Sequence, residues 1–156
     1  MYIINKKSIA FALIISVFVL NIFLEKDNAD KINIIKYSHI QLKRQSDSHF
    51  RIKGKINQLP VIFLIDTGAS YIAVSPLIAK MANLKYIEPI STSTAAGNSS
   101  AHLTLIKQLK IGNIFINNVK AIISPGLMEY EVLLGQNILQ FFQINQVGNI
   151  LSLRTI

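Results

Sequence analysis

The feature that most constrains how this chain folds is a continuous apolar run, Val61–Ile65, that ends directly in the carboxylate of Asp66. An apolar run of this length is typical of a strand buried on both faces. A carboxylate at the end of such a strand is costly unless the fold supplies hydrogen bonds or a second group that shares its proton. The next residues suit that need, because the Thr67 hydroxyl can donate and accept, Gly68 permits a tight turn, and Ala69 is small. We therefore predict that Asp66 is a carboxyl that activates water, supported by these three residues.

Short strands separated by turns dominate the chain from Phe50 onward. The predicted strands are Phe50–Ile56, Val61–Ile65, Tyr71–Val74, Leu103–Leu109, Ile114–Ile116, Val119–Ile123, Glu131–Leu134 and Ile150–Leu153. Gly112-Asn113 and Asn117-Asn118 are predicted as turns between strands. The segment Ser91–Ser100 is rich in small polar residues and is predicted as a hairpin tip or loop. This pattern predicts a mostly β domain.

Two short helices interrupt the predicted strands. Ser75 is expected to cap the first helix, with Pro76 at its first position. The second helix is predicted over Asn137–Phe142. Each helix follows an apolar strand that ends in a Gly-containing turn, Val61–Gly68 in the first case and Val132–Gly135 in the second. The sequence therefore contains a weak internal repeat of a strand, a Gly-containing turn and a helix, and only the first copy contains an Asp.

The N-terminus contains another apolar segment, Ile9–Leu24, which follows Lys6 and Lys7. As a helix it would be about 24 Å long at about 1.5 Å per residue, which is short for a bilayer core unless the flanking lysines reach the interface. A cleaved signal peptide is the alternative. Cleavage after Ala29 would place Asp27 at the −3 position, where signal peptidase sites have a small residue, so this is a poor cleavage site. A buried core helix fits less well, because the segment is apolar all round and terminal.

We therefore expect a signal anchor over residues 1–24, a charged tether over residues 25–44 and a folded domain over residues 45–156. Apolar residues at the end of the tether allow a strand there. The lysines before the anchor hold the N-terminus in the cytoplasm, so the rest of the chain crosses the membrane. In a bacterium this predicts a single-pass protein of the inner membrane whose domain lies on the periplasmic side.

The composition excludes several kinds of chemistry. The chain has no Cys, so disulfides, Cys-ligated metals and thiol nucleophiles are excluded, and the three histidines lack metal-ligand spacing. The net charge is +8, but no dense basic patch with aromatic platforms indicates nucleic-acid binding. Arg51, Lys53 and Lys55 alternate along one predicted strand and are interpreted as its solvated face. We expect no metal, no cofactor and no nucleic acid.

The run Val61–Ser70 resembles the active-site motif of the retropepsin-like aspartic proteases of clan AA. The later Val132–Gly135, in which Leu133 and Leu134 precede the glycine, resembles the second signature of that family. The family's flap falls at Thr94-Ala95-Ala96-Gly97. A single such domain behind an N-terminal membrane segment is similar to a bacterial, membrane-anchored group. The resemblance, which extends from about Phe50 to the C-terminus, implies a closed retropepsin-like β-barrel with one or two short helices, preceded by an N-terminal membrane helix.

Aspartic proteases use two carboxylates that share a proton. This chain has one Asp-Thr-Gly and no Asp after Asp66, and Glu129 and Glu131 are interpreted as surface groups. The second carboxylate is therefore expected from Asp66 of a second copy, in a homodimer with its site on the two-fold axis. The resemblance further implies that Thr67 hydrogen-bonds across the dimer and that the flap around residues 94–97 closes over an extended peptide.

The predicted function is therefore that of an aspartic endopeptidase acting on an extended peptide or protein. The alternative is a peptide-binding or interaction module that keeps the fold without turnover. The presence of Asp66 argues against this alternative. One departure from the viral members is the start of the last helix, where Gln136-Asn137 replaces their Arg.

Overall fold

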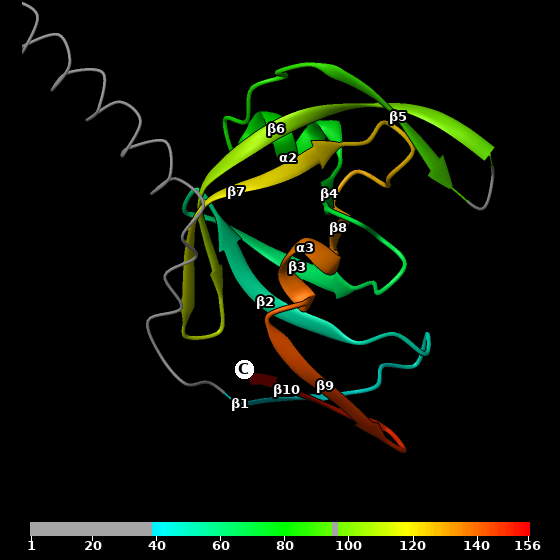
Figure 1. The fold of residues 1–156 in the computed structure, drawn as a ribbon, viewed down its shortest axis with the longest axis vertical. Coiled ribbons are helices and arrows are strands. Elements are labelled where there is room, and N and C mark those ends of the chain that lie inside the picture. The colour runs from blue at the N-terminus through cyan, green and yellow to red at the C-terminus, as the bar shows by residue number, and fades with distance from the viewer. Residues whose placement is uncertain (1–38, 95–96) are drawn as a thin grey trace, which may run out of the picture. The chain divides into compact units, whose positions relative to one another are not determined.

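The structure of the chain, a computed structural model, describes residues 39–94 and 97–156 (Figure 1). All of these residues lie in one unit, Asn33–Ile156. Within the two described ranges, no helix combines the length and the apolar character needed to cross a membrane. The predicted anchor over residues 1–24 lies outside the described residues, as does most of the predicted tether, so both stay predictions.

Six strands form a closed barrel (Figure 1). In order around the barrel they are β2 (Arg51–Ile56), β3 (Leu59–Ile65), β8 (Val132–Leu134), β4 (Ile72–Val74), β7 (Ile114–Ile123) and β6 (Gly97–Ile111). The ring closes where β2 and β6 pair antiparallel, with Gly54 opposite Ile111. A further strand, β5 (Pro89–Thr94), pairs with the N-terminal part of β6. The prediction of a mostly β, closed barrel with few short helices is confirmed.

The strands that precede the two Gly-containing turns lie side by side in the barrel wall. β3 and β8 pair in parallel, with Ile65 opposite Leu134, so both strands end at the same edge. β8 also pairs antiparallel with β4, the strand that follows the first turn. The parallel register therefore brings the turn after Ile65 against the turn after Leu134.

The barrel interior is filled by Phe63 and by aliphatic side chains, which alternate along the strands with outward-facing, mostly polar residues. In β2 the two isoleucines are buried, whereas Lys53 and Lys55 are exposed. Gly54 faces inward between them, where a Cβ would stand 2.2 Å from the carbonyl oxygen of Lys110 on β6. Glycine is needed at this position because the backbones of β2 and β6 approach too closely for a side chain.

A second, three-stranded antiparallel sheet consists of β1 (His39–Lys43), β10 (Ile150–Thr155) and β9 (Phe142–Val147), with β10 in the middle. β1 lies at the end of the predicted tether, where the sequence allowed a strand. β9 was not predicted, because Phe142 was assigned to the last helix. The rest of β9, from Gln143 to Val147, is exposed and therefore lacks the alternation that identifies a half-buried strand.

Both predicted helices exist. α2 (Pro76–Met81) begins as predicted, because the Ser75 hydroxyl oxygen accepts a hydrogen bond from the Ile78 amide at 3.2 Å. α3 spans Gln136–Leu139 and is thus shorter than the predicted helix. It ends early because Phe142 already begins β9.

The long hairpin of β6 and β7 differs from the predicted pattern. The prediction of a turn at Asn117-Asn118 is wrong, because β7 runs continuously through these residues. Asn118 has a φ of 55°, a left-handed conformation that Asn tolerates better than most residues. The predicted tip or loop over Ser91–Ser100 is a hairpin, in which β5 and β6 pair from Pro89↔His102 to Thr94↔Gly97.

Candidate active site

The Asp66 turn, residues 66–70, begins where β3 ends. The Asp66 amide donates to the Leu134 carbonyl oxygen at 3.1 Å, which continues the parallel pairing by one residue. The Asp66 Oδ1 accepts a hydrogen bond from the Gly68 amide at 2.8 Å. A Cβ on Gly68 would stand 3.2 Å from the same oxygen, so the glycine lets the backbone lie close to the carboxylate. The sequence therefore folds here into a tight turn that fixes the Asp66 side chain.

The Gly135 turn, residues 135–137, supports the Asp66 turn through backbone contacts. The Gln136 amide donates to the Ala69 carbonyl oxygen at 2.7 Å, and the Asn137 amide donates to the Ser70 carbonyl oxygen at 3.0 Å. Gly135 is buried, and a Cβ there would stand 2.3 Å from the Tyr71 carbonyl oxygen. The second turn can thus approach the first only because it carries a glycine.

Two side chains of the Gly135 turn strengthen this support. The Asn137 Oδ1 accepts from the Ile72 amide at 3.0 Å, and its Nδ2 donates to the Lys120 carbonyl oxygen at 2.8 Å. The Gln136 Nε2 donates to the Thr67 carbonyl oxygen at 3.1 Å. Neither residue was predicted as part of the site. Their position directly after the second signature was the signal that could have identified them.

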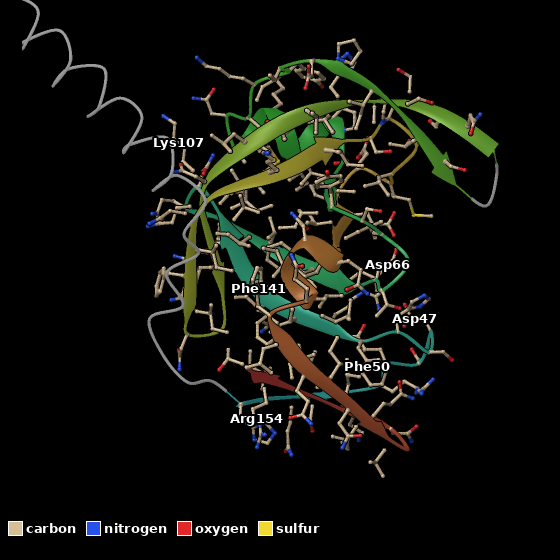
Figure 2. All side chains as sticks on the ribbon, viewed as in Figure 1. Asp47, Phe50, Asp66, Lys107, Phe141 and Arg154 are labelled. Carbon is tan, nitrogen blue, oxygen red and sulfur yellow. The ribbon has the colours of Figure 1, made fainter. Side chains whose placement is uncertain are left out.

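A cleft of about 730 Å³ opens at the Asp66 turn. Figure 2 labels Asp66 on the right of the view, below the β5–β6 hairpin. The cleft is lined by Asp66, Gly68, Ala69, Ser70, Tyr71, Ala73, Ile90, Ser91, Thr92, Ser93, Ile122, Ser124, Leu127 and Leu133. Among these residues Asp66 is the only one with a carboxyl group, and the others offer apolar surfaces and hydroxyl groups. The cleft is therefore suited to an uncharged chain segment lying across one carboxylate.

The hairpin of β5 and β6 forms one wall of this cleft. The structure brings Ile90–Ser93 of β5 to the cleft, a set that lies just before the predicted flap residues. Of those predicted residues, Thr94 pairs with Gly97, which has a φ of 110°. Ala95 and Ala96 lie outside the described residues. The flap over residues 94–97 therefore stays a prediction, and the described residues of the hairpin that line the cleft are Ile90–Ser93.

The other residues of the second signature have different places. Leu133 lines the cleft, whereas Leu134 is fully buried and Gly135 lies beneath the Asp66 turn. Glu129 and Glu131 do not line the cleft. In the part of the chain that the structure describes, no group of three His, Cys, Asp or Glu side chains could hold a metal ion.

A carboxylate outside the cleft has a distinct environment. The Arg51 guanidinium lies 2.6 Å from Asp47 Oδ2, and its hydrogen bond lowers the pKa of Asp47 from 3.8 to about 2. The Asp47 Oδ1 also accepts from the His49 amide at 3.2 Å. The Asp47 carboxylate is therefore engaged by its own chain at both oxygens, whereas the Asp66 carboxylate receives one hydrogen bond, from the Gly68 amide, among the described residues.

A closed barrel that presents an Asp-Thr-Gly turn to a cleft under a hairpin defines a domain of the aspartic protease type. A family model described as "gag-polyprotein putative aspartyl protease" matches residues 52–141. This range covers more than half of the chain, so the chain belongs to this family. The retropepsin-like resemblance of the sequence is thereby confirmed.

Two curated relatives have no described function. The uncharacterized protein RP867 of Rickettsia prowazekii is 31% identical over 109 residues, which make up 67% of this chain and 46% of the relative. An uncharacterized protein encoded in the cobV 5′ region of Sinorhizobium is 26% identical over 113 residues, which make up 69% of this chain and 48% of the relative. The chain thus spans about half the length of the curated relatives it matches.

Solved structures share the fold. A retropepsin-like aspartic protease from Rickettsia conorii matches with a TM-score of 0.63 and 25% identity, over 80% of this chain and 94% of that chain. The EIAV protease in complex with the inhibitor HBY-793 matches with a TM-score of 0.53 and 17% identity, over 62% of this chain and 89% of that chain. These matches confirm the retropepsin-like barrel.

Proposed function

We propose that this chain is an aspartic endopeptidase that hydrolyses peptide bonds with water activated between two Asp66 carboxylates of a homodimer. The observation that carries the proposal is the place of Asp66, which accepts a hydrogen bond from Gly68 at one oxygen and supplies the only carboxylate among the described residues that line the cleft. Membership of the aspartyl protease family and the likeness to the Rickettsia conorii protease support the same chemistry.

The proposed reaction needs one proton shared by the two carboxylates. The ionised carboxylate takes a proton from water as the water oxygen attacks the scissile carbonyl carbon. The protonated carboxyl of the partner gives its proton to the carbonyl oxygen, and a tetrahedral diol forms. The carboxyl that took the water proton then passes it to the amide nitrogen, while one diol hydroxyl returns its proton to the other carboxylate. The carbon–nitrogen bond breaks, which releases a carboxylic acid and an amine. The pair again holds one proton, so the starting state is restored, and the proposed steps use only the two carboxyl groups and water.

Two features of the cleft support the dimer. The described residues that line it supply one carboxylate, so a single copy lacks the second acid. Thr67 is exposed, and its hydroxyl makes no hydrogen bond to the rest of the described chain, so it is free for the Thr67 of a second copy. The hairpin around residues 94–97 is proposed to close over an extended peptide, whose backbone would pair with β5.

The proposed location follows from the apolar segment over residues 9–24. It would anchor the chain once in a bacterial inner membrane and hold the protease domain on the periplasmic side. Two anchored copies share a thin layer, which raises their effective concentration and favours dimerisation.

The test is cleavage of a fluorogenic peptide library by the full chain, beside Asp66→Asn and a matched control, Asp47→Asn. The full chain is preferred because β1, residues 39–43, is part of the fold. We expect Asp66→Asn to lower turnover by about 10³-fold, since it removes the acid–base groups, and Asp47→Asn to leave turnover unchanged. Cleavage that persists in Asp66→Asn would contradict the mechanism.

A covalently linked dimer separates the two functions considered. If the linked wild type cleaves peptides and a linked pair with one Asp66→Asn copy does not, both copies supply the acid. If the linked wild type binds peptides without cleaving any, the non-catalytic module is the better description.

A further inference from the structure

The outer face of the barrel carries lysines and exposed apolar side chains on adjoining strands. The lysine face comprises Lys53, Lys55, Pro60, Ile62, Lys110 and Phe115. In the strand register, Lys55 stands opposite Pro60 on β3 and opposite Lys110 on β6, and Lys110 stands opposite Phe115 on β7. One row of neighbours therefore crosses four strands, and Lys53 with Ile62 forms the next row.

The lysines of this face form no ion pair with a carboxylate of residues 39–94 or 97–156. Lys55 and Lys110 are like charges directly opposite one another, an arrangement that destabilises a sheet. Among the described residues, the ion pairs within 4.0 Å join Asp47 to His49 and Arg51, and none reaches the lysine face. The Lys110 ammonium lies 5.0 Å from the centroid of the Phe115 ring. The positive charge of this face is therefore uncompensated by the described chain.

The apolar members of the face are exposed beside these charges. Ile62 is 53% exposed and Phe115 is 37% exposed, although both lie on strands whose alternate residues fill the core. Lysines interleaved with exposed aliphatic and aromatic groups are the chemistry of a surface that rests at the headgroup level of a bilayer. Lysine ammonium groups bind phosphates as point charges, without the planar geometry of arginine.

We propose that the lysine face docks the barrel onto an anionic phospholipid surface. The three ammonium groups would contact lipid phosphates, and Ile62 and Phe115 would enter the boundary between headgroups and acyl chains. Nucleic acid fits less well, because Phe115 is the one aromatic residue of the face, and a groove for single strands would need several stacking platforms. None of these residues lines the cleft, so docking would leave the Asp66 turn accessible. The proposal stands independently of the protease function and of the anchor.

The chain has no Cys, so one cysteine can report on the face. Asn113→Cys, at the exposed turn between β6 and β7, is labelled with a fluorophore in the full chain. The labelled chain is combined with phosphatidylcholine vesicles, with and without phosphatidylglycerol, that contain a headgroup quencher. We expect quenching in the anionic vesicles at low salt and its loss at high salt, because salt screens exposed charges. This readout applies whether residues 9–24 span the bilayer or not.

Two charge-matched variants decide the question. One carries Lys53→Gln, Lys55→Gln and Lys110→Gln, and the control carries Lys43→Gln, Lys80→Gln and Lys85→Gln. We expect the docking constant to fall about 100-fold in the first variant and by only a few-fold in the control. Equal losses in both variants, equal quenching without phosphatidylglycerol, or no quenching would overturn the proposal. Displacement of the vesicles by single-stranded RNA at a lower phosphate concentration would also overturn it, in favour of a nucleic-acid surface.

Discussion

The Asp66 turn and the Gly135 turn start at the same edge of the barrel but differ in exposure and in what they contact. Both follow strands of one parallel pair, in register at Ile65 and Leu134. The first turn exposes Thr67 and Gly68 and directs a carboxylate into the cleft. The second buries Gly135 under the first. Two turns that follow neighbouring parallel strands can therefore have different roles. Here the first turn presents a carboxylate to the cleft, and the second turn supports the first.

The side-chain hydrogen bonds of the two turns also differ: those of the first turn are local, whereas those of the second reach other segments. In the first turn, a side-chain oxygen of Asp66 accepts from the backbone of its own turn. In the second turn, the side chains of Gln136 and Asn137 bind the backbone of other segments, at Thr67, Ile72 and Lys120. Fixing the second turn therefore fixes the first, and damage to the second is expected to reach the carboxylate.

We expect Gly135→Ala to disrupt the contact between the two turns most strongly. The new Cβ would overlap the Tyr71 carbonyl oxygen at 2.3 Å and the Ala69 carbonyl oxygen at 2.7 Å, and backbone atoms cannot move aside easily. We expect the free energy of unfolding to fall by about 3 kcal/mol, measured by urea denaturation. Gly126→Ala is the matched control, because nothing lies within 4 Å of its added Cβ. A stable Gly135→Ala would mean that the two turns can separate without cost.

The next effect in size is expected from Asn137→Ala. This change removes an acceptor from the Ile72 amide and a donor from the Lys120 carbonyl oxygen, in a partly buried position. We expect the free energy of unfolding to fall by about 2 kcal/mol, again by denaturation. Asn145→Ala on the exposed strand β9 serves as the control and should change stability little. Equal effects of the two substitutions would mean that the side-chain hydrogen bonds of Asn137 do not support the Asp66 turn.

Gln136→Ala sharpens the comparison, because it tests a contact to the Asp66 turn alone. The lost hydrogen bond to Thr67 is exposed, so we expect a loss of about 0.5 kcal/mol in global stability. The more specific result is faster hydrogen exchange of the Gly68 amide, measured by NMR, because the turn opens more often. Gln140→Ala, directly after the same helix, is the control and should leave this amide unchanged.

The smallest effect concerns Asp47, the carboxylate that its own chain satisfies. Its pKa of about 2 lies below the ordinary 3.8, so the Arg51 contact stabilises the fold above about pH 4. That contribution is lost as the pH falls through the folded pKa. The melting temperatures of wild type and Asp47→Asn should therefore differ slightly at neutral pH and converge towards pH 2. A difference that stays constant with pH would exclude the ion pair as its cause.

Local sequence patterns were sufficient where neighbours along the chain determine the structure. Ser75 caps α2 through a hydrogen bond three residues away, and Val61–Ile65 forms a strand that ends in the Asp66 turn, as predicted. Its burial on both faces was predicted wrongly, because Ile62 on the outer face is 53% exposed. The patterns failed where distant segments decide. β9 is a strand because it pairs with β10, and its exposed polar residues carry no periodic signal. The second helix is shorter than predicted for the same reason.

The support of the site was missed for a related reason. Gln136 and Asn137 have partners at Thr67 and Ile72, and only the parallel pairing of β3 and β8 brings these residues together. Likewise, Gly54 and Gly135 are needed because of backbone segments that are distant in sequence. A sequence pattern identified the reactive carboxylate, but the residues that hold it could be recognised only in three dimensions.

The parallel pairing of β3 and β8 also has a consequence for the timing of assembly. The hydrogen bonds that join the Gly135 turn to the Asp66 turn and to the start of β4 connect residues 65 to 69 positions apart in the chain. Contacts of such long sequence separation form late in folding, because a large loop must close first. On the ribosome, Asp66 emerges well before Gly135 exists. The nascent protein therefore carries its carboxylate without the supporting turn until Gly135 and the residues after it have been made, and the Asp66 turn is held in place only from then on.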